Sequence, residues 1–281
     1  MILPKQPQTT SAVAAHYDEL DSFYREIWGE HVHHGYWATG RETAAEAVVS
    51  LIELLARRLR LAPGQLVCDI GCGYGATARL LAESNAVDVT GVTVSAAQAL
   101  HTCPPARGRV SIQQQDWLTN HFPSERFDRA YAIESSEHMP DKQRFFAEAF
   151  RTLKLGGRLA VCAWLACDNP RPWEVRHLLE PICREGRLPS MGDESDYRRF
   201  AEQAGFRLEQ VEDLSDQVRR TWWICTRRAL AALVTKPRYL RFLLNPAATN
   251  RIFALTLFRI MIAYRTRSMR YCLFVFQREP A

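Results

Sequence analysis

The sequence predicts an α/β fold, in which seven strands form one mostly parallel sheet with helices on both of its faces. Short apolar segments alternate with segments of helical period over most of the 281 residues. An apolar share of 47% suffices for one substantial core, or for a core plus a cap. Because strand and helix alternate along the chain, parallel pairing of neighbouring strands is expected.

The first strong helical pattern precedes the sheet, over residues 42–61. Its apolar residues recur every three or four positions, and Pro63 and Gly64 end it. Strands are then predicted at 66–70, 87–94, 110–114, 127–133, 158–164, 206–211 and 271–276. Further helices are predicted between them, at 76–84, 95–103, 141–153 and 196–204.

Four parts are expected along the chain. They are an N-terminal helical lid (1–60), a core (61–165), a lid loop (166–195) and C-terminal core strands (196–281). A helical cap is expected to be inserted into the last part, at about 218–270. Residues 1–11 are interpreted as a flexible leader without a secretory signal. Residues 169–191 are rich in Pro, Trp and charge, which predicts a loop or lid. Pro237 and Pro246 are expected to break the helices of the cap.

The net charge of +5 arises near the C-terminus. Between Arg219 and Gln277 there are twelve Lys or Arg and no Asp or Glu, interleaved with apolar residues at helical intervals. We interpret this as the solvated face of amphipathic helices, although nucleic acid, an anionic substrate or an acidic membrane surface would also suit it. The apolar stretch 252–264 contains Arg259 and is too short to span a membrane.

The cysteines and histidines do not predict a metal site. The eight cysteines lack the spacing of a disulfide framework or a zinc site, so reduced thiols and a cytoplasmic location are expected. His31, His33 and His34 lie close in sequence, but a metal site here would usually include carboxylates as well. Packing or capping roles are therefore favoured for these histidines.

A glycine-rich loop follows the first predicted strand, with the sequence DIGCGYG over residues 69–75. Missing side chains let a ligand lie against the backbone, and amides at a helix start favour negative charge. The spacing GxGxG lacks the further glycine or lysine of phosphate-binding loops. Asp69 would repel a pyrophosphate and suits an ammonium group and hydroxyls, which favours S-adenosylmethionine over a dinucleotide.

This loop resembles that of class I S-adenosylmethionine-dependent methyltransferases, and the resemblance implies their Rossmann-like fold. The segment TGVTVSAAQ, residues 90–98, resembles the second-strand motif of a subfamily that contains tocopherol methyltransferases, sterol methyltransferases and cyclopropane fatty acid synthases. Most class I enzymes have an acidic residue where Thr93 stands, so Thr93 and Gln98 are expected to bind the ribose region instead. Gln115-Asp116-Trp117 resembles the third motif, which implies that Asp116 and Trp117 contact the adenine.

Two further segments resemble the tocopherol methyltransferases. They are Tyr17-Asp18 with WGEHVHHGYW at residues 28–37, and ESSEHMPDK at residues 134–142; residues 263–271 also resemble their tail. The cofactor-binding residues that follow from the loop and the resemblance are Tyr17, Tyr36, Asp69, Gly71, Cys72, Gly73, Thr93, Val94, Gln98, Asp116, Trp117 and Glu134.

Methyl transfer is a displacement that requires an aligned nucleophile, exclusion of water and sometimes a base. Glu137 and His138 follow the fourth strand at the ligand-binding edge, so they are the first candidates for the base, and His34 is the next. Alternatively, Glu137 only anchors the N-terminal segment, and transfer relies on proximity. The residues expected to contact the acceptor are Trp37, Trp164, Trp222 and Trp223, with Phe242, Phe253 and Phe258 of the cap.

The expected function is methyl transfer to oxygen or nitrogen of a small lipophilic, aromatic natural product. C-methylation of an indole, prenyl or sterol-like carbon is the nearest alternative, and a non-catalytic cofactor-binding scaffold is the alternative from another class. Nucleic acid is not expected as a partner, because the short motif of base methylation is missing. The basic C-terminal helices could contact a membrane peripherally, and the chain is expected to be a monomer or homodimer.

Overall fold

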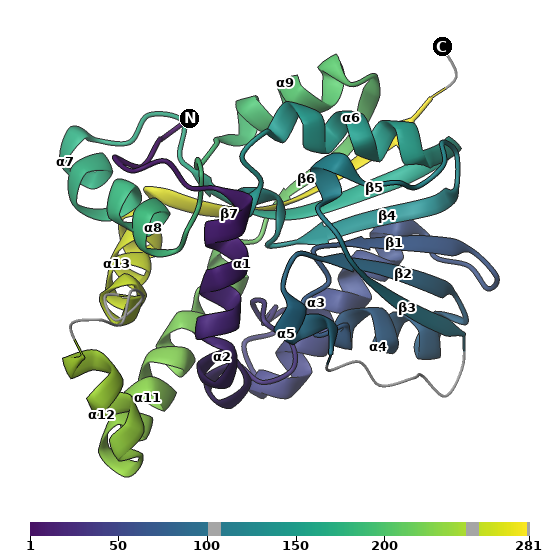
Figure 1. Ribbon diagram of the computed structural model, residues 1–281. Helices are drawn as coiled ribbons and strands as arrows, with labels where there is room; N and C mark the ends of the chain where they lie inside the picture. The colour runs from purple at the N-terminus through teal and green to yellow at the C-terminus, as the bar shows by residue number, and fades with distance from the viewer. Residues whose placement is uncertain (101–107, 246–252, 280–281) are drawn as a thin grey trace.

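The computed structural model describes residues 1–100, 108–245 and 253–279. Seven strands form one sheet in the order β3-β2-β1-β4-β5-β7-β6 (Figure 1). Their bounds are β1 Leu66–Ile70, β2 Asp88–Thr93, β3 Arg109–Gln114, β4 Phe127–Ile133, β5 Leu153–Ala166, β6 Phe206–Asp213 and β7 Met269–Arg278. Strands β1 to β5 pair in parallel, and β7 runs antiparallel between β5 and β6. The predicted α/β fold and its seven strands are confirmed.

Helices cover both faces of the sheet, as predicted. Helices α3 (Ala44–Leu59) and α4 (Ala76–Asn85) lie on one face, and α6 (Lys142–Thr152) and α9 (Glu194–Gln203) on the other (Figure 1). Helix α3 begins with a capping box between Thr43 and Glu46, and it buries apolar side chains at helical spacing against the sheet. Each face therefore has an apolar layer beneath its helices.

The N-terminal helices lie at the carboxyl ends of the parallel strands. They are α1 (Thr10–Glu19) and α2 (Asp21–Ile27), and α1 packs against the short helix α5 (Ala96–Ala99). The prediction of a flexible leader is wrong, because Ile2 forms a β-bridge with Met191 and the Lys5 amide donates to Glu180 at 3.0 Å. The leader is tied to the segment before α9, and it fixes the start of α1.

The predicted lid loop is largely helical. It contains α7 (Pro172–Glu174), a turn of π-helix at Val175–Leu179, and α8 (Glu180–Glu185). Leu179 and Ile182 are buried on one side of this segment, which packs against α13. Two of the prolines that suggested a loop, Pro172 and Pro181, stand in the first turns of helices, where no amide hydrogen is needed.

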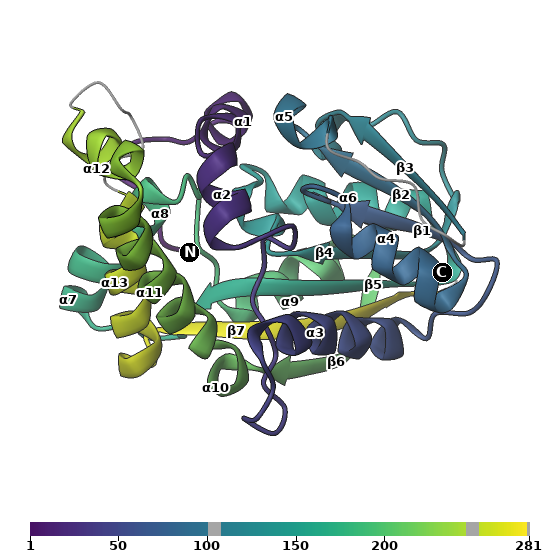
Figure 2. The same ribbon diagram turned by 90° about the horizontal axis from the view of Figure 1, so that it is seen from below.

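A helical segment, which we call the cap, lies between β6 and β7 in sequence; its covering of an acceptor stays a prediction. It comprises α10 (Ser215–Val218), α11 (Arg220–Thr235), α12 (Pro237–Leu244) and α13 (Phe253–Thr266). Figure 2 shows α11, α12 and α13 together at the end of the molecule where α1 and α2 lie. The predicted break at Pro237 is confirmed, whereas Pro246 and the end of the predicted helix 95–103 lie outside the described residues. No helix in the described ranges is long and apolar enough to cross a membrane.

Candidate active site

A tight turn joins β1 to α4 and leaves its backbone open to a cavity. Gly71 has a φ of 81°, and a Cβ there would lie 2.3 Å from the Cβ of Ser135. The amides of Gly71 and Cys72 both donate to the Val92 carbonyl at 2.9 Å, which holds the turn against β2. At Gly73, by contrast, the nearest atom to an added Cβ is Gln98 Nε2 at 3.9 Å. A side chain at Gly73 would therefore project toward open space.

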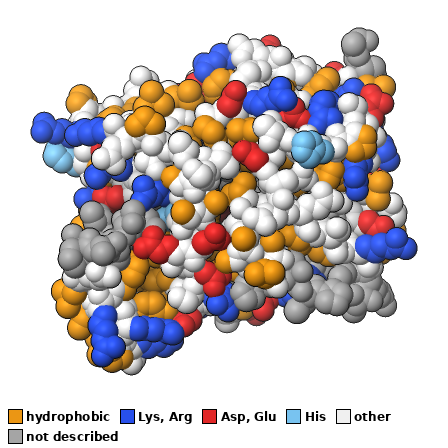
Figure 3. Space-filling model, in the orientation of Figure 1, with side chains coloured by type: hydrophobic (Ala, Val, Ile, Leu, Met, Phe, Trp, Pro, Cys, Tyr) orange, Lys and Arg blue, Asp and Glu red, His pale blue; other side chains and the backbone are white. Residues whose placement is uncertain are grey.

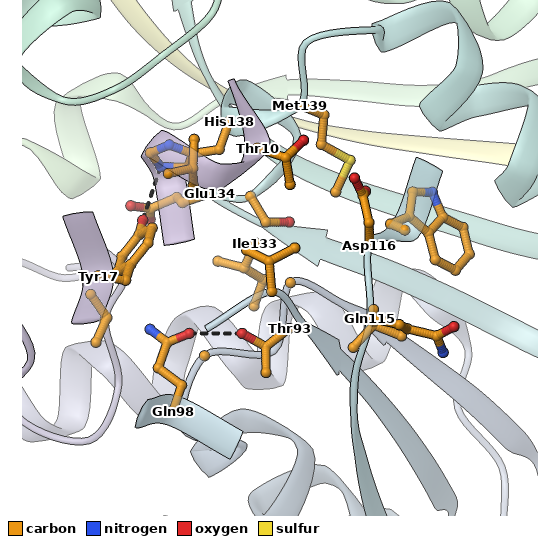
Figure 4. A pocket seen from close by; sticks show the side chains of 18 of the residues that line it. Thr10, Tyr17, Thr93, Gln98, Gln115, Asp116, Ile133, Glu134, His138 and Met139 are labelled. Atoms are coloured by element: carbon orange, nitrogen blue, oxygen red, sulfur yellow. Dashed lines mark hydrogen bonds between the residues drawn. The ribbon is translucent and has the colours of Figure 1, made fainter. Parts of the chain in front are cut away.

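That space belongs to a cavity of about 730 Å³, including its open mouth, at the carboxyl ends of β1, β2 and β4 (Figure 4). Helix α1 closes one side with Thr10, Val13 and Tyr17. The floor and far side are formed by Val32, Gly71, Gly73, Val92, Thr93, Val94, Gln98, Gln115, Asp116, Trp117, Ile133, Glu134, Ser135, His138, Met139 and Pro140. We call it the nucleoside cavity. Thr93 Oγ1 donates to Gln98 Oε1 at 2.9 Å, so the two are held side by side.

A second cavity of about 490 Å³ adjoins the first. Its walls come from the N-terminal helices, β5, α11, α13 and the end of α8, and they comprise Tyr17, Tyr24, Trp28, Val32, Glu134, His138, Trp164, Gly186, Trp222 and Thr256. We call it the aromatic cavity, because five of these side chains are Tyr or Trp. Tyr17, Val32, Glu134 and His138 line both cavities, so the two meet at these residues.

Glu134 lies at this junction in a left-handed backbone conformation, with a φ of 52°. Its Oε1 accepts hydrogen bonds from the His34 amide at 2.7 Å and the Tyr271 hydroxyl at 2.9 Å, and it lies 2.9 Å from His34 Nδ1. Its Oε2 accepts from Trp164 Nε1 at 2.9 Å. Burial alone would raise the pKa of this carboxyl, but its contacts with His34 hold it below its ordinary value. Glu134 is therefore a fixed negative charge.

His138 is the one imidazole on the wall of both cavities within the described residues. Its Nδ1 lies 3.4 Å from the Arg187 carbonyl, and its Nε2 lies 2.9 Å from the Tyr17 hydroxyl. A carbonyl only accepts, so Nδ1 carries the proton and Nε2 accepts from Tyr17. Burial lowers the pKa of His138 to about 3, and nearby His16 acts in the same direction. The ring is therefore neutral near pH 7, and its Nε2 lone pair is directed at the Tyr17 hydroxyl.

Comparison with known proteins assigns this arrangement to a family. The family model described as mycolic acid cyclopropane synthetase matches residues 4–235. The chain belongs to this family. It is thereby a class I S-adenosylmethionine-dependent methyltransferase, and S-adenosylmethionine is its cofactor.

Curated relatives span most of the chain. It is 32% identical to 27-O-demethylrifamycin SV methyltransferase of Amycolatopsis mediterranei, over 76% of this chain and 80% of that protein. It is 31% identical to O-methyltransferase resE of Aspergillus sclerotiorum, over 79% and 86%. The probable tocopherol O-methyltransferase of Oryza sativa subsp. japonica is 30% identical, over 80% and 67%. These matches confirm the resemblance to the tocopherol methyltransferases.

Solved structures share the fold of this methyltransferase. Mycolic acid cyclopropane synthase CmaA1, complexed with SAH and CTAB, superposes with a TM-score of 0.83 at 22% identity, over 97% of this chain and 99% of that one. The [4+2]-cyclase SpnF superposes with a TM-score of 0.80 at 23% identity, over the whole of both chains. At these identities the likeness concerns the fold.

Most residues predicted to bind the cofactor line the nucleoside cavity of the methyltransferase. They are Tyr17, Gly71, Gly73, Thr93, Val94, Gln98, Asp116, Trp117 and Glu134. Two of them also form hydrogen bonds with other parts of the protein. Asp116 Oδ1 accepts from the Leu118 amide at 2.9 Å, and the largely buried Trp117 indole donates to the Phe145 carbonyl at 3.2 Å. Trp117 is only 2% exposed, so little of its indole is open to the cavity.

Three predicted cofactor-binding side chains lie outside that cavity. Asp69 is buried beneath the glycine turn, where the Tyr131 hydroxyl donates to it at 2.8 Å and burial raises its pKa to about 7. The Cys72 side chain points away and packs against Gly91. Tyr36 packs on the core near α3, and its amide donates to the Ala47 carbonyl. These three side chains do not line the cavity, and their contact with the cofactor stays a prediction.

Two of the predicted catalytic residues are committed to structural hydrogen bonds. His34 Nε2 accepts from Trp222 Nε1 at 2.5 Å, while its Nδ1 faces Glu134, so neither nitrogen is available as a base. Glu137 faces away from both cavities, and its Oε1 accepts from the Trp164 amide at 2.5 Å. Burial raises the pKa of Glu137 to about 7. Neither His34 nor Glu137 lines either cavity, whereas His138 lines both; the catalytic roles of all three stay predictions.

Two of the four tryptophans predicted to bind the acceptor line the aromatic cavity, and the other two do not. Trp164 and Trp222 meet in the aromatic cavity, with ring centroids 5.3 Å apart. Trp37 is buried elsewhere and donates to the Glu42 carbonyl at 2.9 Å, whereas Trp223 is 56% exposed on the outer side of α11. Neither Trp37 nor Trp223 lines this cavity. One residue of a helix rotates the side chain by about 100°, which separates Trp222 from Trp223.

Several residues of the aromatic cavity were not predicted. Tyr24 and Trp28 lie in the N-terminal helical segment, where aromatic residues recur four apart, and that spacing was a usable signal. Phe242 packs against Tyr24 without lining the cavity, Phe258 is partly exposed, and Phe253 lies in a part of α13 whose side chains are not described. His31 and His33 contact Thr77. Within the described ranges, no His, Cys, Asp or Glu cluster could hold a metal ion.

Proposed function

We propose that this methyltransferase transfers a methyl group to a hydroxyl of a small lipophilic, aromatic acceptor held in the aromatic cavity. The observation that carries the proposal is the contact between Tyr17 and His138 where the two cavities meet. His138 is neutral, its Nε2 lone pair faces the junction, and its pKa is low because it is buried. An amine nitrogen could use the same proton acceptor.

The nucleoside cavity suits the cofactor by the chemistry of its walls. Gly71 and Gly73 leave space against the backbone, Thr93 and Gln98 offer polar groups for a ribose, and Asp116 can accept from an adenine amino group. When bound, the cofactor supplies an electrophilic methyl carbon on a sulfonium. A bulky side chain at Gly73 would occupy this space.

The protein residues then align the acceptor and receive its proton. The rings of Trp164, Trp222 and Trp28 exclude water and bind an apolar acceptor by burying its apolar surface. With the cofactor supplying the methyl group and its thioether product leaving, His138 Nε2 would take the proton of the acceptor hydroxyl, directly or through the Tyr17 hydroxyl. The fixed charge of Glu134 stabilises the imidazolium that results.

The curated relatives support oxygen as the attacking atom, since those at 30% identity or above include two tocopherol O-methyltransferases and an O-methyltransferase of Aspergillus sclerotiorum. C-methylation is the second candidate. Aromatic faces and the Glu134 carboxylate would stabilise a carbocation, and cycloartenol-C-24-methyltransferase 1 of rice is 29% identical.

Incubation with methyl-labelled S-adenosylmethionine and a panel of phenols, aliphatic alcohols, amines, indoles and prenylated compounds tests the proposal. Label on an oxygen of a lipophilic phenol or alcohol is the expected result. Label on carbon alone would replace the proposal by the C-methylation alternative. Cofactor binding without transfer to any member of the panel would contradict the assigned acceptor class.

We further propose that the outer face of the cap contacts an anionic membrane surface, from which a lipophilic acceptor could enter. Exposed apolar side chains lie on α11, α12 and α13, namely Trp223, Leu230, Val234, Leu240, Leu244, Leu255, Phe258 and Ile262. Exposed arginines such as Arg227 and Arg241 lie among them, and Figure 3 shows both kinds of side chain side by side on this part of the molecule. Apolar and basic groups together favour anionic lipid.

Two finer points belong to the same proposal. Like charges on the cap oppose its pairing with a second copy, so a monomer, or a homodimer formed through another surface, is expected. The described cysteines are all free thiols, which supports a reducing, cytoplasmic compartment. Size-exclusion chromatography with light scattering tests the first point, and fractionation of the native cells tests the second.

A further inference from the structure

Lys142 is a buried lysine that the reaction described above does not use. It is the first residue of α6, and it is only 3% exposed. No carboxylate within the described ranges lies at ion-pair distance from its Nζ, and burial lowers its pKa to about 8. A buried ammonium at the positive end of a helix is unfavourable by itself. Its place in the fold therefore needs another explanation.

Four oxygen atoms surround the Lys142 Nζ. The carbonyls of Glu137 and Met139 lie at 3.4 and 3.3 Å, and the Ser190 carbonyl and hydroxyl at 3.1 and 2.8 Å. The first two oxygens belong to the turn after β4, on either side of His138. The other two belong to the segment between α8 and α9. Lys142 thus joins the turn after β4 to Ser190, which lies 48 residues after Lys142 itself.

The same two pieces of chain are joined by His138 itself. Its Nδ1 lies 3.4 Å from the carbonyl of Arg187, three residues before Ser190. This long hydrogen bond decides which ring nitrogen carries the proton, because a carbonyl cannot donate. Small shifts of the Arg187 segment would break the bond and release the ring. The four contacts of Lys142 oppose such shifts from both sides.

We propose that Lys142 is a positioning residue, which clamps the segment from Arg187 to Ser190 against the turn after β4 and thereby keeps the Nε2 lone pair of His138 directed at Tyr17. The effect that this proposal predicts on the reaction rate rests on the proposed role of His138 as proton acceptor. Its structural part concerns the tautomer of His138 and does not depend on any acceptor.

The test is nitrogen NMR of the protein labelled with ¹⁵N-histidine, with the His138 signals assigned through His138→Asn. In the wild type, His138 is expected to show one neutral tautomer with the proton on Nδ1. In Lys142→Met, which keeps the length of the side chain but none of its donors, a mixture of both tautomers is expected. Lys154→Met is the matched control, because Lys154 pairs with Asp128 on the surface at 2.8 Å. It should keep the wild-type spectrum.

A Lys142→Met protein whose His138 keeps the wild-type tautomer would overturn the proposal. Should this variant fail to fold, Ser190→Ala removes only the hydroxyl contact, and it should still shift the tautomer ratio toward the mixture; an unchanged ratio counts against the clamp. The spectrum needs no acceptor, so failure here is distinct from failure to find a methylated product. With an acceptor in hand, Lys142→Met should lower kcat about tenfold with little change in KM, and Lys154→Met should change neither.

Discussion

The Tyr17 hydroxyl of α1 and Nε2 of His138, after β4, lie 2.9 Å apart at the point where the nucleoside and aromatic cavities meet. The contact spans 121 residues of sequence and ties the N-terminal lid to the edge of the sheet. Because both residues line both cavities, the packing of α1 and the orientation of the His138 ring depend on the same hydrogen bond.

Removal of either member of this pair should slow the transfer step. His138→Ala should lower kcat for hydroxyl acceptors by about 10²–10⁴-fold, since it deletes the proton acceptor. Tyr17→Phe should have a smaller effect, about tenfold, because the imidazole remains. Single-turnover rates with labelled cofactor measure both. Calorimetry with S-adenosylhomocysteine is the control, and its Kd should stay within about threefold for His138→Ala. Full rates in both variants would show that proximity alone drives transfer.

Two adjacent tryptophans allow a matched test of the aromatic cavity. Trp222 is buried in its wall, and Trp223 is exposed on the other side of the same helix. Trp222→Phe should lower kcat/KM for the acceptor at least about tenfold through lost packing, whereas Trp223→Phe should leave it unchanged. Equal effects of the two substitutions would argue against the assigned cavity.

The outer face of the cap predicts binding to anionic lipid. Co-sedimentation with vesicles of phosphatidylglycerol should exceed that with phosphatidylcholine and should weaken as salt is added. The double variant Trp223→Ser, Arg227→Ser should bind the anionic vesicles less, because it removes one apolar and one basic side chain from α11. Lys154→Met, at the start of β5, serves as control. Equal binding to both kinds of vesicle, or to neither, would contradict the proposed surface.

Asp69 predicts a pH dependence of stability. Its pKa is raised from 3.8 to about 7 by burial, so between about pH 4 and 7 the folded protein retains a proton that the unfolded chain has lost. Rising pH therefore lowers stability through this residue, by about 1.4 kcal/mol per pH unit. Asp69→Asn lacks this term, so its free energy of unfolding relative to the wild type should increase from pH 5 to 6.5 in urea titrations. Asp128→Asn is the control, because the pKa of Asp128 is lowered and no slope arises there. A flat difference for Asp69→Asn would mean that its carboxyl is ionised in the fold.

Glu134→Gln should lower the stability of the protein as well as the rate of methyl transfer. The carboxylate accepts from Tyr271, Trp164 and His34, and an amide would present its own N–H groups to one or more of these donors. A loss of about 3 kcal/mol in the free energy of unfolding is expected for a buried carboxylate in such a network. Glu53→Gln, which alters an exposed pair with Arg57, should change it by less than about 0.5 kcal/mol. Urea titration at one pH decides between these outcomes.

The centre of the sheet was predictable because β1, β4 and β5 are largely buried and therefore form mostly apolar segments. The limits predicted for the first and fourth strands agree with β1 and β4. The segment 172–185 was not predictable in the same way. Its burial arises from contact with α13, about 80 residues later, and its prolines and charges resemble those of a loop.

The nucleoside cavity was mostly predictable, because its backbone turn and polar groups follow successive strands in order. The proton acceptor was not. In sequence Glu137 and His138 are the first candidates and His34 is the next, and what separates them in the fold is that only His138 lines the two cavities. Trp222, 188 residues away, occupies His34, while Arg187 turns the lone pair of His138 toward Tyr17. Such partners depend on tertiary contacts that no local spacing contains.

A crystal structure with S-adenosylhomocysteine and a methylated product, once the labelling experiment has supplied one, tests the central claim most directly. The two-cavity arrangement predicts the nucleoside over Gly71 and Gly73, the ribose near Thr93 and Gln98, and the product oxygen within hydrogen-bond reach of Tyr17 or His138 Nε2. A product bound outside the aromatic cavity, or a methylated atom remote from both Tyr17 and His138, would contradict it.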